Sequence, residues 1–208
     1  MSKTISSTTV IGAGALGSGV AEALKRSGKP VQLLDRNLEK ATEAVADVKV
    51  GTIGDEVTGD VVVLTVPYTA IDEVLASYDD GFEGKIVIDV ANTIDFATFE
   101  SALEPGVSSA QLTAEKLPKA TVLKAFNTNF AATLASGKVG ENTTTVTLAG
   151  DDADAKASLR ELLESASLRV KDAGGLSKAP QLEGFGALQI NLAATEQIAW
   201  TGGFAVIE

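Results

Sequence analysis

Short apolar runs alternate with longer amphipathic segments from the start of the chain. The β-branched run at 8–12 precedes a segment in which Leu16, Val20 and Leu24 recur every four residues, and Gly28 follows its basic last turn. This spacing predicts a strand, a helix and a helix stop. The alternation continues with apolar runs of the kind that parallel sheets bury on both faces. Further predicted strands cover 30–35, 59–67, 84–92, 120–126, 142–150 and 168–173, and predicted helices cover 15–28, 37–48, 71–76, 129–136, 151–167 and 181–200.

This alternation predicts the fold class α/β, with a Rossmann-type, doubly wound and mostly parallel sheet that is extended by C-terminal strands and a helix. Residues 1–208 form one compact domain in this interpretation. In the last helix an apolar stripe most simply packs on the sheet, and a dimer interface is the other interpretation. The stripe consists of Leu182, Phe185, Leu188 and Leu192.

A glycine-rich turn connects the first predicted strand to the first predicted helix. The sequence VIGAGALGSG matches G-x-G-x-x-G in that context, and the next strand ends in Asp35, 18 residues after the third glycine. Such a turn brings the backbone to a pyrophosphate, and the carboxylate reaches a ribose. The motif therefore predicts dinucleotide binding by a core at 7–150, with 151–208 completing the sheet and a second-substrate cleft. The expected contacts in the turn are Gly12, Ala13, Gly14, Ala15, Leu16 and Gly17.

The residues after the second strand leave the type of dinucleotide open. Asp35 accepts the hydrogen bonds of a ribose diol and repels a 2′-phosphate, which favours NAD. Arg36 and Lys40 favour NADP, because a guanidinium and an ammonium bind a 2′-phosphate. The prediction is therefore NAD(P).

Polar or small residues follow three of the later predicted strands. Ligands of open parallel sheets bind beyond the carboxyl ends of the strands, so these exits are expected to line the nicotinamide channel. Asn127 is expected to hold the carboxamide or the second ring, and Asn129 to cap the next helix. The predicted channel residues are Thr65, Val66, Pro67, Tyr68, Ala91, Asn92, Ala125, Phe126 and Asn127.

Composition narrows the chemistry further. With 17 basic and 28 acidic residues the net charge is −11, which disfavours nucleic acid and anionic membranes as partners. The absence of cysteine and histidine excludes thiolate nucleophiles, imidazole-based catalysis and ordinary zinc sites. No metal site is predicted, since the acidic cluster at 151–154 is interpreted as a helix cap. A cytoplasmic location is expected, because no run of about 18 apolar residues occurs.

Several segments together resemble a known family. VIGAGALGSGVAEAL, LTVPY, VLKAFNTNFAATL and LAGDDADAKASLRELLE, followed by VKDAGGLSKAPQLEGFGALQINLA, are similar to NADPH-dependent reductases of the deazaflavin coenzyme F420. The pattern is also similar to the oxidoreductase domain of the STEAP metalloreductases and to pyrroline-5-carboxylate reductases. The resemblance implies a homodimer in which the nicotinamide faces F420 or a flavin. One departure is Asp35, because NADP-using members carry a small polar residue before the arginine.

The expected reaction is hydride transfer between the nicotinamide and a flavin-like ring, which needs stacked rings and little acid–base machinery. No catalytic residue is assigned. An imine or carbonyl reductase of the pyrroline-5-carboxylate reductase type is an alternative, and it would need Tyr68 or Lys124 as a proton donor. A non-catalytic sensor of NAD(P)(H) is a third possibility, because a fold alone does not define an activity.

Overall fold

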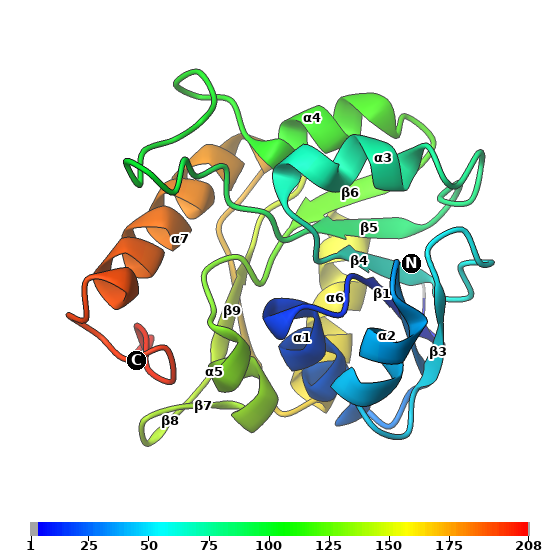
Figure 1. Ribbon diagram of the computed structural model, residues 1–208, viewed down its shortest axis with the longest axis horizontal. Coiled ribbons are helices and arrows are strands. Elements are labelled where there is room, and N and C mark those ends of the chain that lie inside the picture. Colours follow the sequence, from blue (N-terminus) through cyan, green and yellow to red (C-terminus); the bar gives the residue numbers. More distant parts are fainter. Residues whose placement is uncertain (1–3, 208) are drawn as a thin grey trace.

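The computed structural model describes residues 4–207, which are organised around a six-stranded, fully parallel sheet (Figure 1). The strand order is β3-β2-β1-β4-β5-β6, so the direction of winding reverses between β1 and β4. Such a reversal opens a crevice at the carboxyl ends of the strands, where ligands bind. The strands are β1 (Thr8–Ile11), β2 (Val31–Asp35), β3 (Lys49–Thr52), β4 (Val61–Leu64), β5 (Ile86–Asp89) and β6 (Thr121–Lys124).

Helices cover both faces of this sheet, with α3 and α4 on one side and α1 and α6 on the other (Figure 1). All the predicted helices are present, although α2 and α7 are shorter than expected. The sequence prediction missed strand β3 and helix α4, whose helical segment SAQLTAEK is too polar to show an apolar stripe. The helices are α1 (Ala15–Lys25), α2 (Leu38–Ala44), α3 (Ile71–Leu75), α4 (Ser109–Lys116), α5 (Ala131–Ser136), α6 (Ala153–Ser165) and α7 (Ala179–Ala194).

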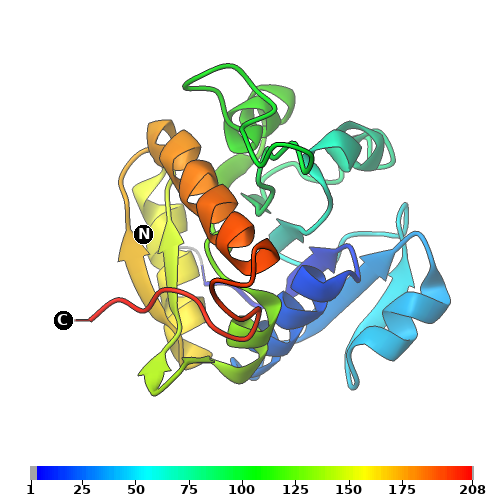
Figure 2. The ribbon, with the colours of Figure 1, turned by 60° about the vertical axis from the view of Figure 1, so that its left-hand side comes forward.

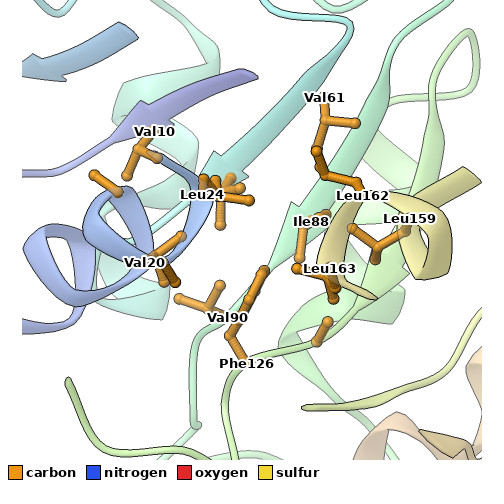
Figure 3. Close-up of a cluster of buried hydrophobic side chains, with 14 of the residues drawn as sticks. Val10, Val20, Leu24, Val61, Ile88, Val90, Phe126, Leu159, Leu162 and Leu163 are labelled. Atoms are coloured by element: carbon orange, nitrogen blue, oxygen red, sulfur yellow. The ribbon is translucent and has the colours of Figure 1, made fainter. Parts of the chain in front are cut away.

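Strands β1, β2, β4, β5 and β6 are rich in apolar residues because each of them contributes to two cores. In β1, Val10 belongs to the core under α1 and α6, whereas Ile11 belongs to the core under α3. Figure 3 shows the first core, where Val10 and Val20 lie near Leu24 and where Leu159 of α6 packs toward Ile88. This two-sided burial explains why the sequence shows continuous apolar runs instead of alternation.

The C-terminal strands form a separate pair instead of lengthening the main sheet. β9 (Thr145–Leu148) and β10 (Arg169–Asp172) pair in parallel. Two backbone hydrogen bonds of 2.8 and 2.9 Å between Lys124 and Ala149 join this pair to β6. The predicted boundary at residue 150 therefore separates two paired strands, β9 and β10. A short hairpin of β7 (Lys138–Val139) and β8 (Asn142–Thr143) precedes them.

Helix α7 does not pack its apolar stripe on the sheet, so that prediction is wrong. Its buried face is small or polar, whereas Phe185 and Leu188 are 40% and 52% exposed. Phe185 contacts Phe204 of the tail at a ring-centroid distance of 5.3 Å. The helix ends at Ala194, and the tail then turns back (red in Figure 2). The buried face consists of Ala179, Glu183, Gly186, Gln189 and Ala193.

Helix length in this fold is modest throughout. Within residues 4–207, no helix has the length and apolar character needed to cross a bilayer.

Candidate dinucleotide and acceptor site

The turn between β1 and α1 requires glycine at two of its three motif positions. Gly12 has φ +111°, and a Cβ on it would lie 2.6 Å from the carbonyl oxygen of Thr65. A Cβ on Gly17 would lie 1.8 Å from the carbonyl oxygen of Gly12, because the helix starts directly against the turn. Gly14 differs, since a Cβ there would meet no atom within 4 Å. The open space at Gly14 therefore faces outward, where a pyrophosphate would approach the backbone.

The N-terminus of α1 is prepared for an anion. Gly14 is its N-cap residue and brings no side-chain acceptor, and the first turn contains no acidic residue. The first-turn N–H groups and the positive end of the helix dipole therefore face outward together. Ala13, Gly14 and Ala15 line a cavity of about 390 Å³, called here the α1 cavity, and the charged residues that line it are Lys40, Glu39 and Glu43. This geometry fits the phosphates of a dinucleotide.

Thr65 fixes the glycine turn from the neighbouring strand. Its Oγ1 lies 2.9 Å from the Ile11 carbonyl oxygen and 2.7 Å from the Gly12 carbonyl oxygen. Its backbone N–H also donates to the Ile11 carbonyl at 2.8 Å. Thr65 was predicted as a cofactor contact. In the structure its hydroxyl holds the glycine turn in place, and the residue also lines the cavity at the ends of β4 and β5.

Asp35 connects the end of β2 to the same turn. Its Oδ2 accepts the Ala13 N–H at 2.7 Å and lies 3.3 Å from the Lys40 ammonium, and its Oδ1 accepts the Asn37 N–H at 3.0 Å. Burial raises the pKa of the Asp35 carboxyl, but the N–H groups of Asn37 and Ala13 and the Lys40 ammonium outweigh it, so the pKa is lowered from its ordinary value. Asp35 is therefore an ionised group that orients the loop beside the expected ribose.

Arg36 and Lys40 lie on two different sides of Asp35. Lys40 lines the α1 cavity, whereas Arg36 lines a second cavity of about 230 Å³, called here the α3 cavity. Arg36 also makes a solvent-exposed ion pair of 3.5 Å with Glu73. The α3 cavity also contains the apolar residues Ile53, Val66, Ala70 and Val74, which suit an adenine ring.

A larger cavity of about 640 Å³ lies at the ends of β4 and β5 and is called here the central cavity. Its volume is in the range that holds a small organic ligand. Of the predicted channel residues it contains the β4 exit and the β5 exit, together with Leu16 of α1. Its lining residues are Leu16, Thr65, Val66, Pro67, Tyr68, Thr69, Val90, Ala91, Asn92, Ile94, Asp95, Phe96, Ala102 and Ile190.

A hairpin-like loop at 94–101 and helix α7 form the part of the central cavity that sequence reasoning missed. The loop is closed by a bridge between Ile94 and Ser101, and its Phe96 side chain is 72% exposed although it lines the cavity. The Phe96 and Phe99 rings meet edge to face at 6.4 Å. Ile190 of α7 also lines the cavity. The one local signal for this loop was the pair of phenylalanines in a polar segment.

The β6 exit is placed differently from the prediction. Ala125 and Phe126 are wholly buried, so their side chains do not reach the central cavity. Asn127 is 4% exposed, and its Nδ2 donates to the Asn92 Oδ1 at 2.9 Å and to the Leu182 carbonyl at 2.8 Å. Asn127 therefore lies behind Asn92, which lines the cavity.

Asn129 does not cap α5, contrary to the prediction. Its Nδ2 donates to the Thr145 carbonyl of β9 at 3.0 Å, and the N-cap residue of α5 is Phe130, which makes no side-chain cap. Asp152 does cap α6 as predicted, because its Oδ1 accepts the Ala155 N–H at 2.8 Å.

Lys124 belongs to a buried ionic network and is not in the cavity. Its fully buried ammonium lies 2.8 Å from Asp89 Oδ1 and 2.7 Å from Glu183 Oε1, and it also donates to the Ala91 carbonyl. Glu183 in turn accepts the Thr93 hydroxyl at 2.9 Å. The network fastens α7 to the β5 exit directly behind the cavity lining. Lys124 is therefore unsuitable as the proton donor that the alternative mechanism required.

Asp89 completes this network through neutral donors. Its Oδ2 accepts the Ser109 hydroxyl at 2.7 Å and the Thr113 hydroxyl at 2.9 Å, both from α4. Its Oδ1 also accepts the Ala91 N–H at 2.9 Å. The β5 exit is thus held by α4, β6 and α7 at the same time, which keeps Ala91 and Asn92 in a fixed position.

The open N-terminus of α1, with the Asp35 carboxylate beside it, fits a dinucleotide-binding protein, and a separate apolar cavity lies at the strand exits. Comparison with known proteins agrees. Residues 7–93 match the family model described as NADP oxidoreductase, coenzyme F420-dependent. A protein of Arthrobacter sp. FB24, named as a candidate F420-dependent NADP reductase, superposes with a TM-score of 0.81 at 26% identity, covering 98% of this chain and 100% of that one.

Two further relatives are similar to most of this chain. A hypothetical protein of Sinorhizobium meliloti is 34% identical, with a TM-score of 0.75, and the match covers 84% of this chain and 88% of that one. The glycerol-3-phosphate dehydrogenase (NAD(P)+) of Paracoccus denitrificans (strain Pd 1222) is 31% identical over 174 residues, which is 79% of this chain. The chain spans about half, 52%, of that curated relative's length. These matches relate the chain to NAD(P)-dependent oxidoreductases, and residues 7–93 to the model of the F420-dependent NADP oxidoreductases.

Proposed function

We propose that the protein transfers a hydride between NAD(P)(H) and a flat, flavin-like acceptor such as F420 or a flavin. The observation that carries the proposal is the central cavity, which adjoins the glycine turn at Leu16 and Thr65 and is lined mostly by apolar side chains. A bound nicotinamide would supply the hydride. The residues present bind and orient two rings and keep water away from them, which is the main requirement of such a transfer.

The two ends of the site would divide the work. The α1 cavity, with Gly14, Ala15 and Lys40, would hold the phosphates, while Arg36 and the α3 cavity would hold the adenosine. The nicotinamide would then reach the β4 and β5 exits, where Val66, Ala91 and Asn92 line the cavity. Phe96 would stack on the outer face of the acceptor, since an aromatic ring exposed at a cavity mouth gains contact area when a flat ligand covers it.

The test is oxidation of NADPH and NADH by the purified protein with F420, FMN, FAD and riboflavin as acceptors. Turnover with at least one of these rings is the expected result. Dinucleotide binding without turnover of any acceptor would favour the sensor alternative.

An imine or carbonyl reductase is the second candidate, and Tyr68 favours it. The Tyr68 side chain is partly exposed and lines the central cavity, so its hydroxyl is available to protonate a reduced nitrogen or oxygen. Tyr68→Phe separates the two functions. The variant would lose most activity toward imines or carbonyls, whereas transfer to a flavin ring would persist.

We also propose that two copies associate through α7. The apolar side chains of Phe185 and Leu188 are exposed there, and Trp200 and Phe204 of the tail are also about half exposed. Such a patch of large apolar side chains commonly marks an interface. Light scattering of the wild type and of a Leu188→Glu variant tests this, since the variant should be a monomer.

A further inference from the structure

The central cavity has a one-sided charge. Of the described residues that line it, Asp95 alone is charged, and none is lysine or arginine. A neighbouring cavity of about 340 Å³ between the 99–107 segment and α7 is lined by Glu104 and by Glu183, whose carboxylate is paired with Lys124. The charged residues among the described lining of these two cavities are therefore all acidic.

Three basic residues of the site, Lys124, Arg36 and Lys40, lie outside the central cavity and do not offer it a cation. Lys124 lies behind the β5 exit, where two carboxylates and the Ala91 carbonyl already bind its ammonium. Arg36 and Lys40 line the α3 and α1 cavities at the dinucleotide end. A phosphate placed in the central cavity would lose water without gaining a cation, which is unfavourable. The net charge of −11 adds to that repulsion.

Asp95 supplies the one charge among the described residues that line the central cavity. It follows Ile94 in the loop that carries Phe96, and its side chain is at the surface. Its Oδ1 accepts the Ala97 N–H at 2.8 Å, which fixes the carboxylate in the turn that carries Phe96, and both residues line the central cavity. A flat acceptor bound in the central cavity would therefore meet one carboxylate and no cation among the lining residues.

We propose that the acceptor site selects a flat aromatic molecule that is neutral or cationic, and that it discriminates against rings with a phosphate-bearing side chain. This inference rests on the proposed function. It separates the acceptors named above, because FMN, FAD and F420 carry phosphate whereas riboflavin does not. In the reaction, reduced nicotinamide gives a hydride, with its two electrons, to the ring. The ring then takes one proton from water, and oxidised nicotinamide is released.

Riboflavin and FMN are the matched probes, because they share one ring system and differ by a phosphate. Their affinities for the complex of the protein with NADP+ are measured by quenching of flavin fluorescence, and their turnover with NADPH is measured in parallel. Repulsion of a phosphate by a partly screened carboxylate predicts that riboflavin binds roughly 5- to 30-fold more tightly at low salt. The difference should shrink as salt is added.

Asp95→Asn should narrow this difference severalfold, since the asparagine retains the acceptor for the Ala97 N–H but not the charge. Asp79→Asn removes one charge from an exposed residue outside the central cavity and should leave the difference unchanged. Equal or tighter binding of FMN, or no binding of either flavin, would overturn the inference. Tighter binding of riboflavin without turnover would support the charge selection and would contradict only the proposed hydride transfer.

Discussion

Charge is placed oppositely at the two ends of the site. At the dinucleotide end, Arg36 and Lys40 line the cavities themselves, where a ligand can contact them, and Lys40 is paired with Asp35. At the acceptor end the buried charges of Lys124, Asp89 and Glu183 lie in and behind the β5 exit. The first end is suited to recognise phosphates and ribose, whereas the second uses its charges to hold an apolar cavity in shape.

The largest expected effect concerns the buried charges. Lys124→Met leaves Asp89 and Glu183 without their cation, and breaking such a buried pair typically costs about 3–5 kcal/mol of unfolding free energy. Lys40→Met removes a half-exposed partner of Asp35 and should cost about 0–1 kcal/mol. Urea denaturation of both variants provides the measurement. Similar losses in the two variants would show that the contrast between the ends is not real.

Gly14→Val tests the phosphate end. A Cβ at this position meets no protein atom within 4 Å, so the fold should survive with at most about 1 kcal/mol lost at the helix cap. It would occupy the approach of the pyrophosphate to the α1 N-terminus. Losing two charge-assisted hydrogen bonds predicts an NADPH affinity roughly 100-fold weaker by calorimetry. Unchanged affinity in a folded variant would exclude this loop as the phosphate site.

Phe96→Ala tests the acceptor end. A lost ring stack is worth about 0.5–1.5 kcal/mol, so KM for the acceptor should rise roughly 2- to 12-fold. KM for NADPH should stay the same, because Phe96 lies outside the α1 and α3 cavities. Phe99→Ala serves as the control, since Phe99 does not line the central cavity. A rise in KM for NADPH alone would show that the Phe96 ring contacts the dinucleotide and not the acceptor.

Asp35→Ser probes the preference between NADPH and NADH. Removing the carboxylate should raise the ratio of NADPH to NADH affinity roughly tenfold, which corresponds to about 1.4 kcal/mol. Both affinities should fall, because the Ala13 N–H loses its acceptor. If the ratio does not rise, the carboxylate is not a filter against the 2′-phosphate.

The smallest effect is the pH dependence of stability contributed by Asp35. Its pKa is lowered in the folded protein, so its contribution is complete above the unfolded value of about 3.9 and is lost as the pH falls through the folded pKa. The stability difference between wild type and Asp35→Asn should therefore be constant above about pH 5 and shrink in acid. A difference that changes near neutral pH would assign the titration to another group.

The sequence predicted the parts of the site that depend on local geometry. Gly12, Gly17 and Asp35 could be assigned because a tight turn, a close helix start and a strand-end carboxylate each demand one residue type at one spacing. The Rossmann-type fold is confirmed for the same reason, since continuous apolar strands that alternate with amphipathic helices have few other arrangements.

The parts that failed depend on tertiary contacts. Lys124 and Glu183 are 59 residues apart and pair only after α7 docks, which no spacing rule reveals. The docking also reverses the expected orientation of α7, because it buries Glu183 and Gln189 and leaves Leu188 exposed. Ala125 and Phe126 look like strand-exit residues, but they are wholly buried in the core under α1 and α6.

The central claim is that one site holds the dinucleotide and a flat acceptor together. Its most direct test is a single-turnover measurement of NADPH oxidation with riboflavin, followed by the loss of reduced-nicotinamide absorbance in the wild type, Gly14→Val and Phe96→Ala. We expect fast oxidation in the wild type, a defect in Gly14→Val that disappears at high NADPH, and a defect in Phe96→Ala that disappears at high riboflavin. Binding of NADPH without oxidation, or loss of both ligands in either variant, would contradict the claim.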